Sequence, residues 1–596
     1  EAGNINNSTF IDIIVEILGK DKITVIDPEN IESKIIKHKC LPDSLDDFSS
    51  YFIKSDDEKN DKKKAIVSNV KNMNQFKRRI LGLISYFPDI DALLPKYEKM
   101  KDFHVIIIPM SDFQFGVYEE ARVQERKIEL NNAKKRKKTA AGNIYEESTS
   151  TYRIFSRAFC NFVFPRPDIK RPMPREDAEI SELMESADED LLDAISIEEK
   201  LKDTEGKYDA EELKAANDKN DNSEIIVNEN YEQRIISAVK QLEANSETYF
   251  SPTSPEGLQK LSPKFLHILE NITDEDHIGL HLIYSQFRTL EGIGILALIL
   301  KANGYSQFKI KKNAANWSID IPLEERGNKT FVLYTGTETA EEKEIMRNIF
   351  NSNWDAIKDQ NLKTELQAIH ENNFYGEIIK VIMITASGAE GISLSNVRYV
   401  HITEPYWHPV RIEQVIGRAR RICSHTRLEP ELQTVEVFLY LMTLSDEQKT
   451  SDLSVELRLK DKSKLDKTTP YTSDEALFEI SNIKENINRE IIHNIKEASI
   501  DCNIHTRFDG KEKLKCFTFG TATPNTFSYL PSLSAEEDDT MAEKNIVAKN
   551  IEAVELIIPK IGKCVLNTET DEVYDYDSYM KKKPIPIGRL ITVNGK

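Results

Sequence analysis

The stretch 385–425 limits the fold of this chain more than any other part of the sequence. It follows the apolar run Val-Ile-Met-Ile at 381–384, which is typical of a buried parallel strand. A small-residue turn comes next, followed by Glu-Pro-Tyr-Trp-His-Pro at 404–409 and Gln-Val-Ile-Gly-Arg-Ala-Arg-Arg at 414–421. A strand, a turn and a helix in this order predict an α/β fold with a parallel sheet.

The turn after the strand consists of residues that can approach a phosphate closely. Thr385, Ser387, Gly388 and Gly391 are all small. Their hydroxyl groups can donate hydrogen bonds, and glycine has no Cβ that would hold a ligand away from the backbone N–H groups. The composition therefore predicts a phosphate-binding turn.

Polar residues of the last pattern recur at helical spacing. On a helix predicted for 411–423, one face carries Gln414, Gly417, Arg418 and Arg421, at i, i+3, i+4 and i+7. Two guanidinium groups on that face could point at a γ-phosphate held by a facing domain, where an arginine finger typically contributes roughly 10³ to 10⁵ in rate. The alternative is a solvated helix face paired with carboxylates. The upstream turn, the spacing and the order of the motifs favour the first interpretation.

Further strand and helix patterns surround this region. Strands are predicted at 105–111, 280–285, 331–336, 398–402 and 435–439, and helices at 111–132, 289–303 and 338–351. This alternation is typical of a parallel sheet with crossover helices. Because parallel strands end at one edge, Thr385 and the segment 285–288 should emerge together, where open α/β sheets bind ligands.

These motifs resemble those of superfamily 2 helicases and translocases. The segment 285–288 resembles motif IV, the turn at 385–394 motif V and the helix at 414–421 motif VI. Finer likeness lies at 404–409 and in the stretches 76–87, 145–148 and 155–165. It points to the Swi/Snf-related ATPases of large cytoplasmic DNA viruses, such as mimivirus-like helicases, the poxvirus early transcription factor small subunit and nucleoside triphosphate phosphohydrolase I. The resemblance implies a RecA-like second helicase lobe, with a parallel sheet and helices on both faces.

The resemblance also implies a role for each motif residue. Arg418, Arg421 and Gln414 would be catalytic, and the nucleotide would be faced by Gly388, Glu390, Gly391 and Gly417. The nucleic-acid backbone would be contacted by Ser285, Gln286, Arg288, Thr385 and Ser387. No residue is predicted to bind a metal directly. The implied ligands are ATP, Mg²⁺ and nucleic acid, with double-stranded DNA the expected form.

A complete motor of this kind also has a first lobe, with Gly-x-x-x-x-Gly-Lys-Ser/Thr for the phosphates and an Asp-Glu pair for magnesium. Every Gly-Lys pair of this sequence lacks the upstream glycine, and none precedes Ser or Thr. Asp-Glu-Asp-His at 274–277 follows a helical pattern rather than a buried strand. We therefore expect the chain to be the C-terminal part of a longer polypeptide, inactive alone, whose first lobe holds most of the contacts to ATP and Mg²⁺.

Length and composition favour several domains. A chain of 596 residues is too long for one core. We predict a lead-in and connector at 1–104, the RecA-like lobe at 105–440 with an acidic insertion at 166–261, and a mixed α+β accessory region at 441–596. Six cysteines without a Cys-x-x-Cys pair suggest neither zinc ribbons nor a disulfide framework, which fits a reducing compartment. No apolar run is long enough to span a membrane, so no membrane partner is expected, and the expected location is the viral factory in the host cytoplasm or the virion.

The net charge of −20 is concentrated in one segment. Residues 176–233 include 21 acidic and five basic residues and few aromatic ones, which predicts a solvated insertion. This segment is either a surface spacer or an acidic arm that competes with DNA or docks a basic partner. Lys-Lys-Arg-Lys-Lys at 134–138 is likewise either a solvated loop or a contact to nucleic-acid phosphates.

Two other patterns predict packing. The aromatic residues at 152–164 have mixed spacing and are predicted to be core rather than base-stacking platforms. Thr472-x-x-Glu475 is a capping box that predicts the start of a helix with an apolar stripe from Leu477 to Ile495.

Two functions of different class remain open. The first is half of an ATP-dependent nucleic-acid translocase in viral transcription, with the first lobe of the same polypeptide and a viral RNA polymerase as partners. The second is a noncatalytic scaffold that keeps the fold of the lobe to bind a polymerase or DNA. Intact Gln414, Arg418 and Arg421 favour the first, because a scaffold has no need of paired arginines facing a cleft.

Overall fold

The computed structural model covers most of the predicted motifs. The residues that it describes are 7–20, 41–54, 69–86, 93–136, 153–172, 231–288, 290–313, 316–325, 327–335, 338–385, 391–451, 460–463, 467–502, 504, 514–516, 553–558, 562–568, 571–580 and 586–590. The chain divides into two compact units. One, called here the sheet unit, comprises 65–69 and 86–493 and holds the helicase-like motifs; the other, the terminal unit, comprises 1–64, 70–85 and 494–596.

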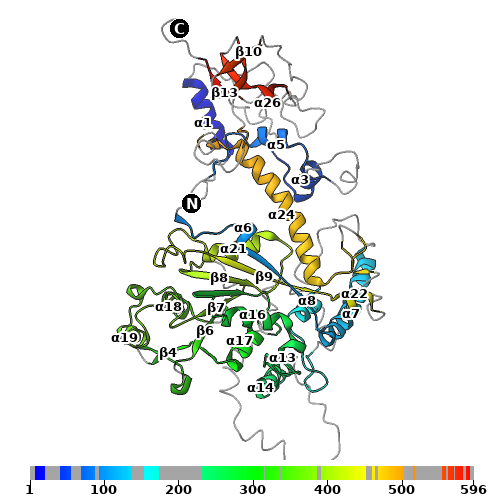
Figure 1. Ribbon diagram of the computed structural model, residues 1–596, viewed down its shortest axis with the longest axis vertical. Helices are drawn as coiled ribbons and strands as arrows, with labels where there is room; N and C mark the ends of the chain where they lie inside the picture. The colour runs from blue at the N-terminus through cyan, green and yellow to red at the C-terminus, as the bar shows by residue number, and fades with distance from the viewer. Residues whose placement is uncertain are drawn as a thin grey trace, which may run out of the picture. The chain divides into compact units, whose positions relative to one another are not determined.

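A seven-stranded parallel sheet forms the centre of the sheet unit (Figure 1). Its strand order is β1-β9-β8-β2-β7-β6-β3. In chain order the strands are β1 Phe103–Pro109, β2 Leu280–Tyr284, β3 Tyr305–Gln307, β6 Lys329–Tyr334, β7 Val381–Ile384, β8 Val397–Ile402 and β9 Glu436–Thr443. The six predicted strands are thus confirmed as members of one sheet.

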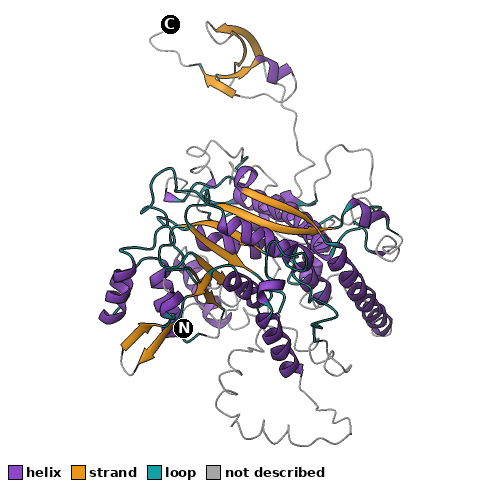
Figure 2. Cartoon of the chain, turned by 60° about the horizontal axis from the view of Figure 1, so that its bottom comes forward, coloured by secondary structure: helices purple, strands orange, loops and turns teal. Residues whose placement is uncertain are grey.

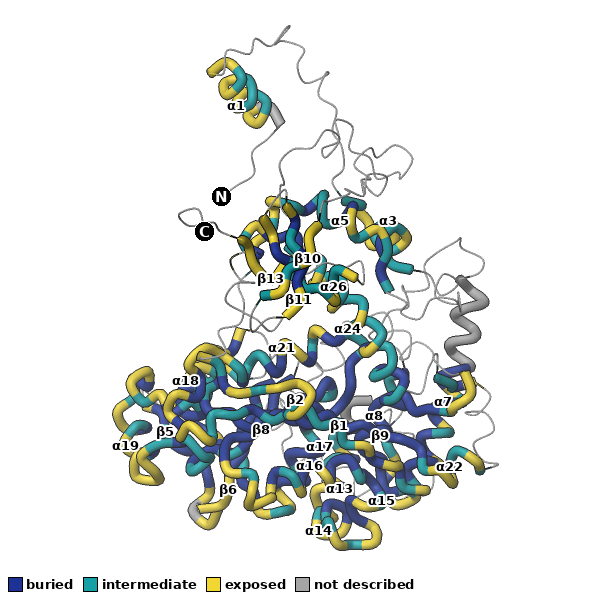
Figure 3. Tube along the Cα trace, turned by 45° about the horizontal axis from the view of Figure 1, so that its top comes forward, coloured by how far each residue is buried: buried dark blue, intermediate teal, exposed yellow. Residues whose placement is uncertain are grey.

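Alternate strand residues face two hydrophobic cores, one on each side of the sheet. On β2, Ile283 belongs to the first core, whereas Leu282 and Tyr284 belong to the second. The first core includes α7 Asp112–Arg136, α8 Ile154–Asn161, α13 Tyr231–Ala244, α16 Pro263–Thr273 and α17 Ile293–Ala302. The second includes α18 Ala340–Phe350, α19 Gln360–Ile369 and α21 Pro409–Ala419. Helices therefore cover both faces of buried strands (Figures 2 and 3), and the predicted RecA-like α/β fold is confirmed.

Local hydrogen bonds explain where two helices begin. Thr339 and Glu342 form a capping box at the start of α18. Thr472 and Glu475 form the predicted one at the start of α24 (Ser473–Ala498), each side chain accepting from the other residue's backbone N–H. The aromatic side chains of 159, 162 and 164 are buried in the first core, as predicted.

Shorter elements complete the sheet unit. They are α6 Lys99–Asp102, α14 Ser246–Tyr249, α15 Leu258–Leu261, α22 Asp446–Thr450, the hairpin β4 Ile310–Asn313 with β5 Asn316–Ile319, and the 3-10 turns Leu323–Glu325 and Trp354–Ala356. Leu242, Phe250 and Leu258 belong to the first core, so the part of the chain just before motif IV is packed on the sheet.

The terminal unit combines helices with a small antiparallel sheet. Its helices are α1 Asn7–Lys20, α3 Leu45–Phe52, α5 Met73–Ile80 and α26 Tyr576–Met580. Its strands are β10 Ala553–Ile558, β11 Gly562–Asn567, β12 Glu572–Asp575 and β13 Pro586–Arg589. This confirms the mixed α+β character predicted for the C-terminal region. Cys502 and Cys516 form one disulfide bond, which the cysteine spacing did not predict.

Two charged features lie outside the described residues. They are positions 176–230 of the acidic segment and the side chains of the basic run at 134–138. The alternatives for both stay open. No helix in the described ranges is both long enough and apolar enough to cross a membrane.

Candidate functional site

The strand order of the sheet reverses around β2, so its carboxyl end lies between two other strand ends. β2 pairs with β7 on one side and β8 on the other, and Tyr284 is level with Ile384 and Ile402. Ser285 and Thr385 are the next residues of their strands. The predicted motif IV and motif V segments therefore emerge side by side, at the kind of switch point where open α/β sheets bind ligands.

A buried carboxylate, that of Glu404, holds this edge together. Glu404 follows β8 and is 1% exposed. Its Oε1 accepts hydrogen bonds from the Ser285 hydroxyl at 2.6 Å and the Asn161 amide at 2.5 Å, and its Oε2 accepts one from the Gln286 backbone N–H at 3.0 Å. The carboxylate thus joins the ends of β8 and β2 to the last residue of α8.

Ser285 and Gln286 are predicted to contact nucleic acid, yet both side chains are buried. The Ser285 hydroxyl faces Glu404. The Gln286 amide nitrogen donates to the Pro405 carbonyl at 3.4 Å, and its oxygen accepts from the Arg157 guanidinium. Any contact that this segment makes to nucleic acid would use backbone groups or the residues that follow.

A buried ion pair extends the network around Glu404. Lys264 is 0% exposed, and its Nζ donates to Asn161 Oδ1 at 2.9 Å and to Asp474 Oδ2 at 2.6 Å. Asp474 also accepts from the Met442 backbone N–H at 3.1 Å. Burial raises the pKa of Glu404, and the charge of Lys264 and the three hydrogen bonds oppose this shift. Polar contacts therefore run from β8 through α8 and α16 to the first turn of α24.

Helix α21 ends two residues before Arg421. Its last two carbonyl groups accept from the Leu394 N–H and the Ser424 hydroxyl, both at 3.2 Å, so they are satisfied without another helical turn. The prediction of one helix over 411–423 is therefore wrong in its last turn. Arg421 lies in an exposed turn rather than on the helix face.

The outer face of α21 keeps the other three predicted residues. Gln414 is exposed, and Arg418 is half-buried, with Nη1 donating to the Ile392 carbonyl at 3.4 Å. A Cβ placed at Gly417 would meet no atom within 4 Å, so a ligand can approach the helix closely there. This face offers guanidinium and amide groups, which fit an anionic ligand such as the phosphates of ATP.

The motif V turn is described only at its two ends. Thr385 is buried, and its hydroxyl donates to the Thr335 carbonyl at 3.5 Å. Gly391 has a φ of +72°, a left-handed conformation that favours glycine. Ser387, Gly388 and Glu390 lie outside the described residues, so their roles stay predictions, as does that of the half-buried Arg288. In the described parts of the chain, no group of three or more His, Cys, Asp or Glu side chains could hold a metal ion.

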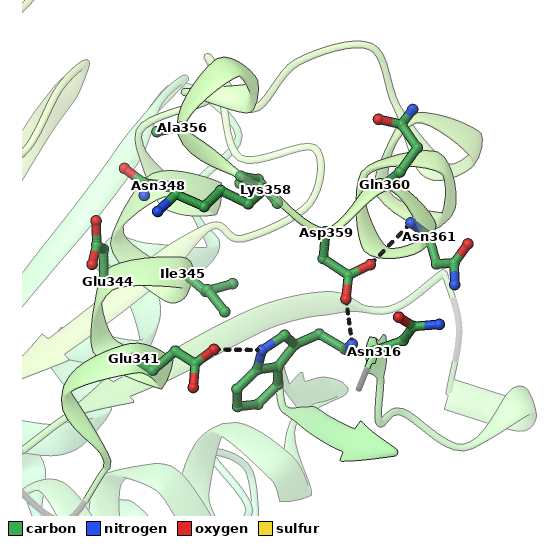
Figure 4. A pocket seen from close by; sticks show the side chains of 12 residues that line it. Asn316, Glu341, Glu344, Ile345, Asn348, Ala356, Lys358, Asp359, Gln360 and Asn361 are labelled. Atoms are coloured by element: carbon green, nitrogen blue, oxygen red, sulfur yellow. Dashed lines mark hydrogen bonds between the residues drawn. The ribbon is translucent and has the colours of Figure 1, made fainter. Parts of the chain in front are cut away.

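A separate pocket of about 520 Å³ lies between β5, α18 and the residues before α19 (Figure 4). Two of its carboxylates already have partners: Glu341 accepts from the Trp317 indole N–H at 3.1 Å, and Asp359 accepts from the Trp317 backbone N–H at 2.5 Å. None of the described motif residues lines this pocket, so it is distinct from the site that the motifs define.

Comparison with known proteins agrees with the fold and the motifs. Residues 311–423 match the family model of the helicase conserved C-terminal domain. The sheet and the motifs at its carboxyl edge are thus similar to those of superfamily 2 helicases, and the chain resembles helicases of large DNA viruses.

Two viral proteins are similar to this chain over longer stretches. The chain is 25% identical over 575 residues to a putative ATP-dependent RNA helicase (R350) of Acanthamoeba polyphaga mimivirus, covering 88% of this chain and 60% of that protein. It is 30% identical over 254 residues to the termination factor NPH-I homolog of an African swine fever virus isolate, covering 37% of this chain and 32% of that protein. The chain thus spans less than two thirds of either relative. The solved C-terminal part of the Fun30 ATPase domain is 16% identical at a TM-score of 0.30, covering 66% of this chain and 98% of that one.

Three residues of the edge network were missed by sequence reasoning. Asn161, Lys264 and Glu404 are each buried and polar, but the first two lie in segments whose pattern predicts only packing. Glu404 could have been found, because it follows a predicted buried strand at the edge that the sequence assigns to ligand binding.

Proposed function

We propose that this chain supplies the second motor lobe of an ATP-dependent translocase that moves on double-stranded DNA in viral transcription. The observation that carries the proposal is the joint position of two sites on one sheet. The ends of β2 and β7 form a switch point, and α21, which follows the adjacent β8, presents Gln414, Gly417 and Arg418 on an open face. Nucleic acid and nucleotide could thus be held by one rigid element.

The proposed chemistry is phosphoryl transfer from ATP to water. Arg418 would place its guanidinium against charge that develops on the γ-phosphate, and Gln414 and Arg421 would lie near it. The partners would be the first lobe of the same polypeptide, which would hold most of the contacts to ATP and Mg²⁺, and a viral RNA polymerase. The name of the African swine fever virus relative, a termination factor, supports a role in transcription, in viral factories or the virion.

Substitution of Arg418 tests this function in the intact polypeptide. Arg418→Ala should lower kcat for ATP by roughly 10²-fold or more while leaving DNA affinity largely unchanged. The matched control is Arg420→Ala, because that guanidinium packs over the Tyr97 ring at 5.7 Å and should matter little for turnover. Wild-type turnover from Arg418→Ala would refute the motor and favour the scaffold. Stimulation of ATP hydrolysis by single-stranded RNA but not by duplex DNA would refute the proposal that the translocase moves on double-stranded DNA.

A further inference from the structure

We infer that Glu404 is a positioning residue, whose carboxylate fixes the backbone of Ser285 and Gln286 and so sets how the end of β2 meets a nucleic-acid backbone. The inference rests on the proposed function, because it assigns nucleic acid to this edge. It goes beyond that function because it names the side chain that fixes the conformation at the carboxyl end of β2. No catalytic role is assigned to Glu404, since it is buried beneath the edge.

The hydrogen bonds at Glu404 require a group that only accepts. Three groups donate to it: the Ser285 hydroxyl and the Asn161 amide at one oxygen, and the Gln286 backbone N–H at the other. An ionised carboxylate has acceptor sites on both oxygens and no proton to place. The donors therefore match the carboxylate and no neutral side chain of the same shape.

The orientation of the Asn161 amide is fixed by its other neighbour. Asn161 Oδ1 accepts from the Lys264 ammonium at 2.9 Å, and an ammonium group can only donate. The amide nitrogen must therefore face Glu404, because turning the amide over would set two donors against each other at Lys264 and two acceptors against each other at Glu404. Since Lys264 is held in turn by Asp474, the whole arrangement has one consistent set of hydrogen bonds.

This reasoning makes Glu404→Gln an informative substitution. The side chain keeps its size, but its amide nitrogen must replace one of the two oxygens. In one orientation the nitrogen faces the Gln286 backbone N–H, and in the other it faces the Asn161 amide nitrogen. The Asn161 amide cannot turn over, so either orientation sets a donor against a donor. One orientation loses the bond to the Gln286 backbone N–H and the other loses the bond to Asn161, and both should loosen the hold of residue 404 on the end of β2.

A half-buried carboxylate elsewhere in the sheet unit provides a control with the same hydrogen-bond pattern. Asp359 also accepts from three N–H groups: those of Asn361 and Leu362 at one oxygen and that of Trp317 at the other. Asp359→Asn therefore creates the same conflict between donors. It lies at the start of α19 beside the pocket of Figure 4, which none of the described motif residues lines.

The experiment compares the affinity of the full chain for duplex DNA with its thermal unfolding temperature, for wild type and both variants. Glu404→Gln should weaken DNA binding about tenfold, the size expected for one lost charge-assisted hydrogen bond. Asp359→Asn should leave the affinity unchanged at a similar loss of Tm. Amide hydrogen exchange should show protection lost around 285–288 in Glu404→Gln and retained there in the control.

The outcomes separate this inference from the proposed function. DNA binding by Glu404→Gln equal to wild type would overturn the inference and leave the motor standing. An equal loss of DNA affinity in Glu404→Gln and Asp359→Asn would also overturn the inference, because Glu404 would then affect binding only through the stability of the protein. Failure of the wild-type chain to bind any duplex would instead refute the proposed function, and with it the ligand named here.

Discussion

Lowering the pH from about 7.5 to about 5 should destabilise the sheet unit by about 2 kcal/mol for each of two buried histidines, His401 and His425. Burial lowers the pKa of His401 to about 3 and that of His425 to about 4. In the unfolded chain both would titrate near the ordinary value of about 6.5. The unfolded state therefore binds protons first, so this stability is fully present above pH 6.5 or so and is lost as the pH falls towards the folded pKa values.

For His401, the hydrogen bonds of the ring also favour the neutral form. His401 Nδ1 lies 2.8 Å from the Tyr440 hydroxyl, and its Nε2 lies 2.9 Å from His281 Nδ1. Since the Tyr440 oxygen already accepts from the Asn271 amide, the simplest set of protons has Tyr440 donating to His401 and His401 donating to His281. A second proton on His401 would break this chain. The pKa of His281 is also lowered well below its usual value, first by burial and then by His401, which should add to the effect.

Urea unfolding followed by tryptophan fluorescence would measure this loss. All three tryptophans of the chain lie in the sheet unit, so the signal reports on that unit alone. His425→Gln should reduce the pH dependence by about 2 kcal/mol, because an amide does not titrate in this range and can still donate to the Val397 carbonyl. The exposed His370→Gln is the control. A pH dependence of equal size in wild type and His425→Gln would refute the reasoning.

Three further predictions concern the edge, the buried network and the acidic segment. Thr385→Ala should weaken the stimulation of ATP hydrolysis by DNA more than the basal rate, whereas an equal fall in both rates would assign Thr385 to the nucleotide. Lys264→Met should lower the free energy of unfolding of the sheet unit by about 3–5 kcal/mol, because Asp474 loses its buried cation; no change in urea unfolding would contradict this. Deleting 176–233 should tighten DNA binding at low salt, since that segment carries most of the negative charge; equal affinities of deletion and parent would rule it out.

The strands could be predicted because a parallel strand buried on both faces leaves a continuous apolar run, as in β7. The start of α24 could be predicted because a capping box is a local pattern. The end of α21 could not, because the groups that satisfy its last carbonyls come from Leu394 and Ser424, which helical spacing does not include. The bond between Cys502 and Cys516 was missed for a similar reason, since their spacing matches no framework.

Because α21 ends at Ala419, the two arginines of motif VI, Arg418 and Arg421, are held differently. The Arg418 carbonyl accepts from the Leu394 N–H, so the backbone at the last helical turn is tied to the segment that follows the motif V turn. A second bond, from the Asn396 N–H to the Ser424 carbonyl at 3.0 Å, joins the same two segments further along. An arginine finger acts by holding its charge where charge develops. On the proposed function, the sheet therefore sets the position of Arg418, whereas Arg421 lies in an exposed turn and would depend on the facing lobe for its order.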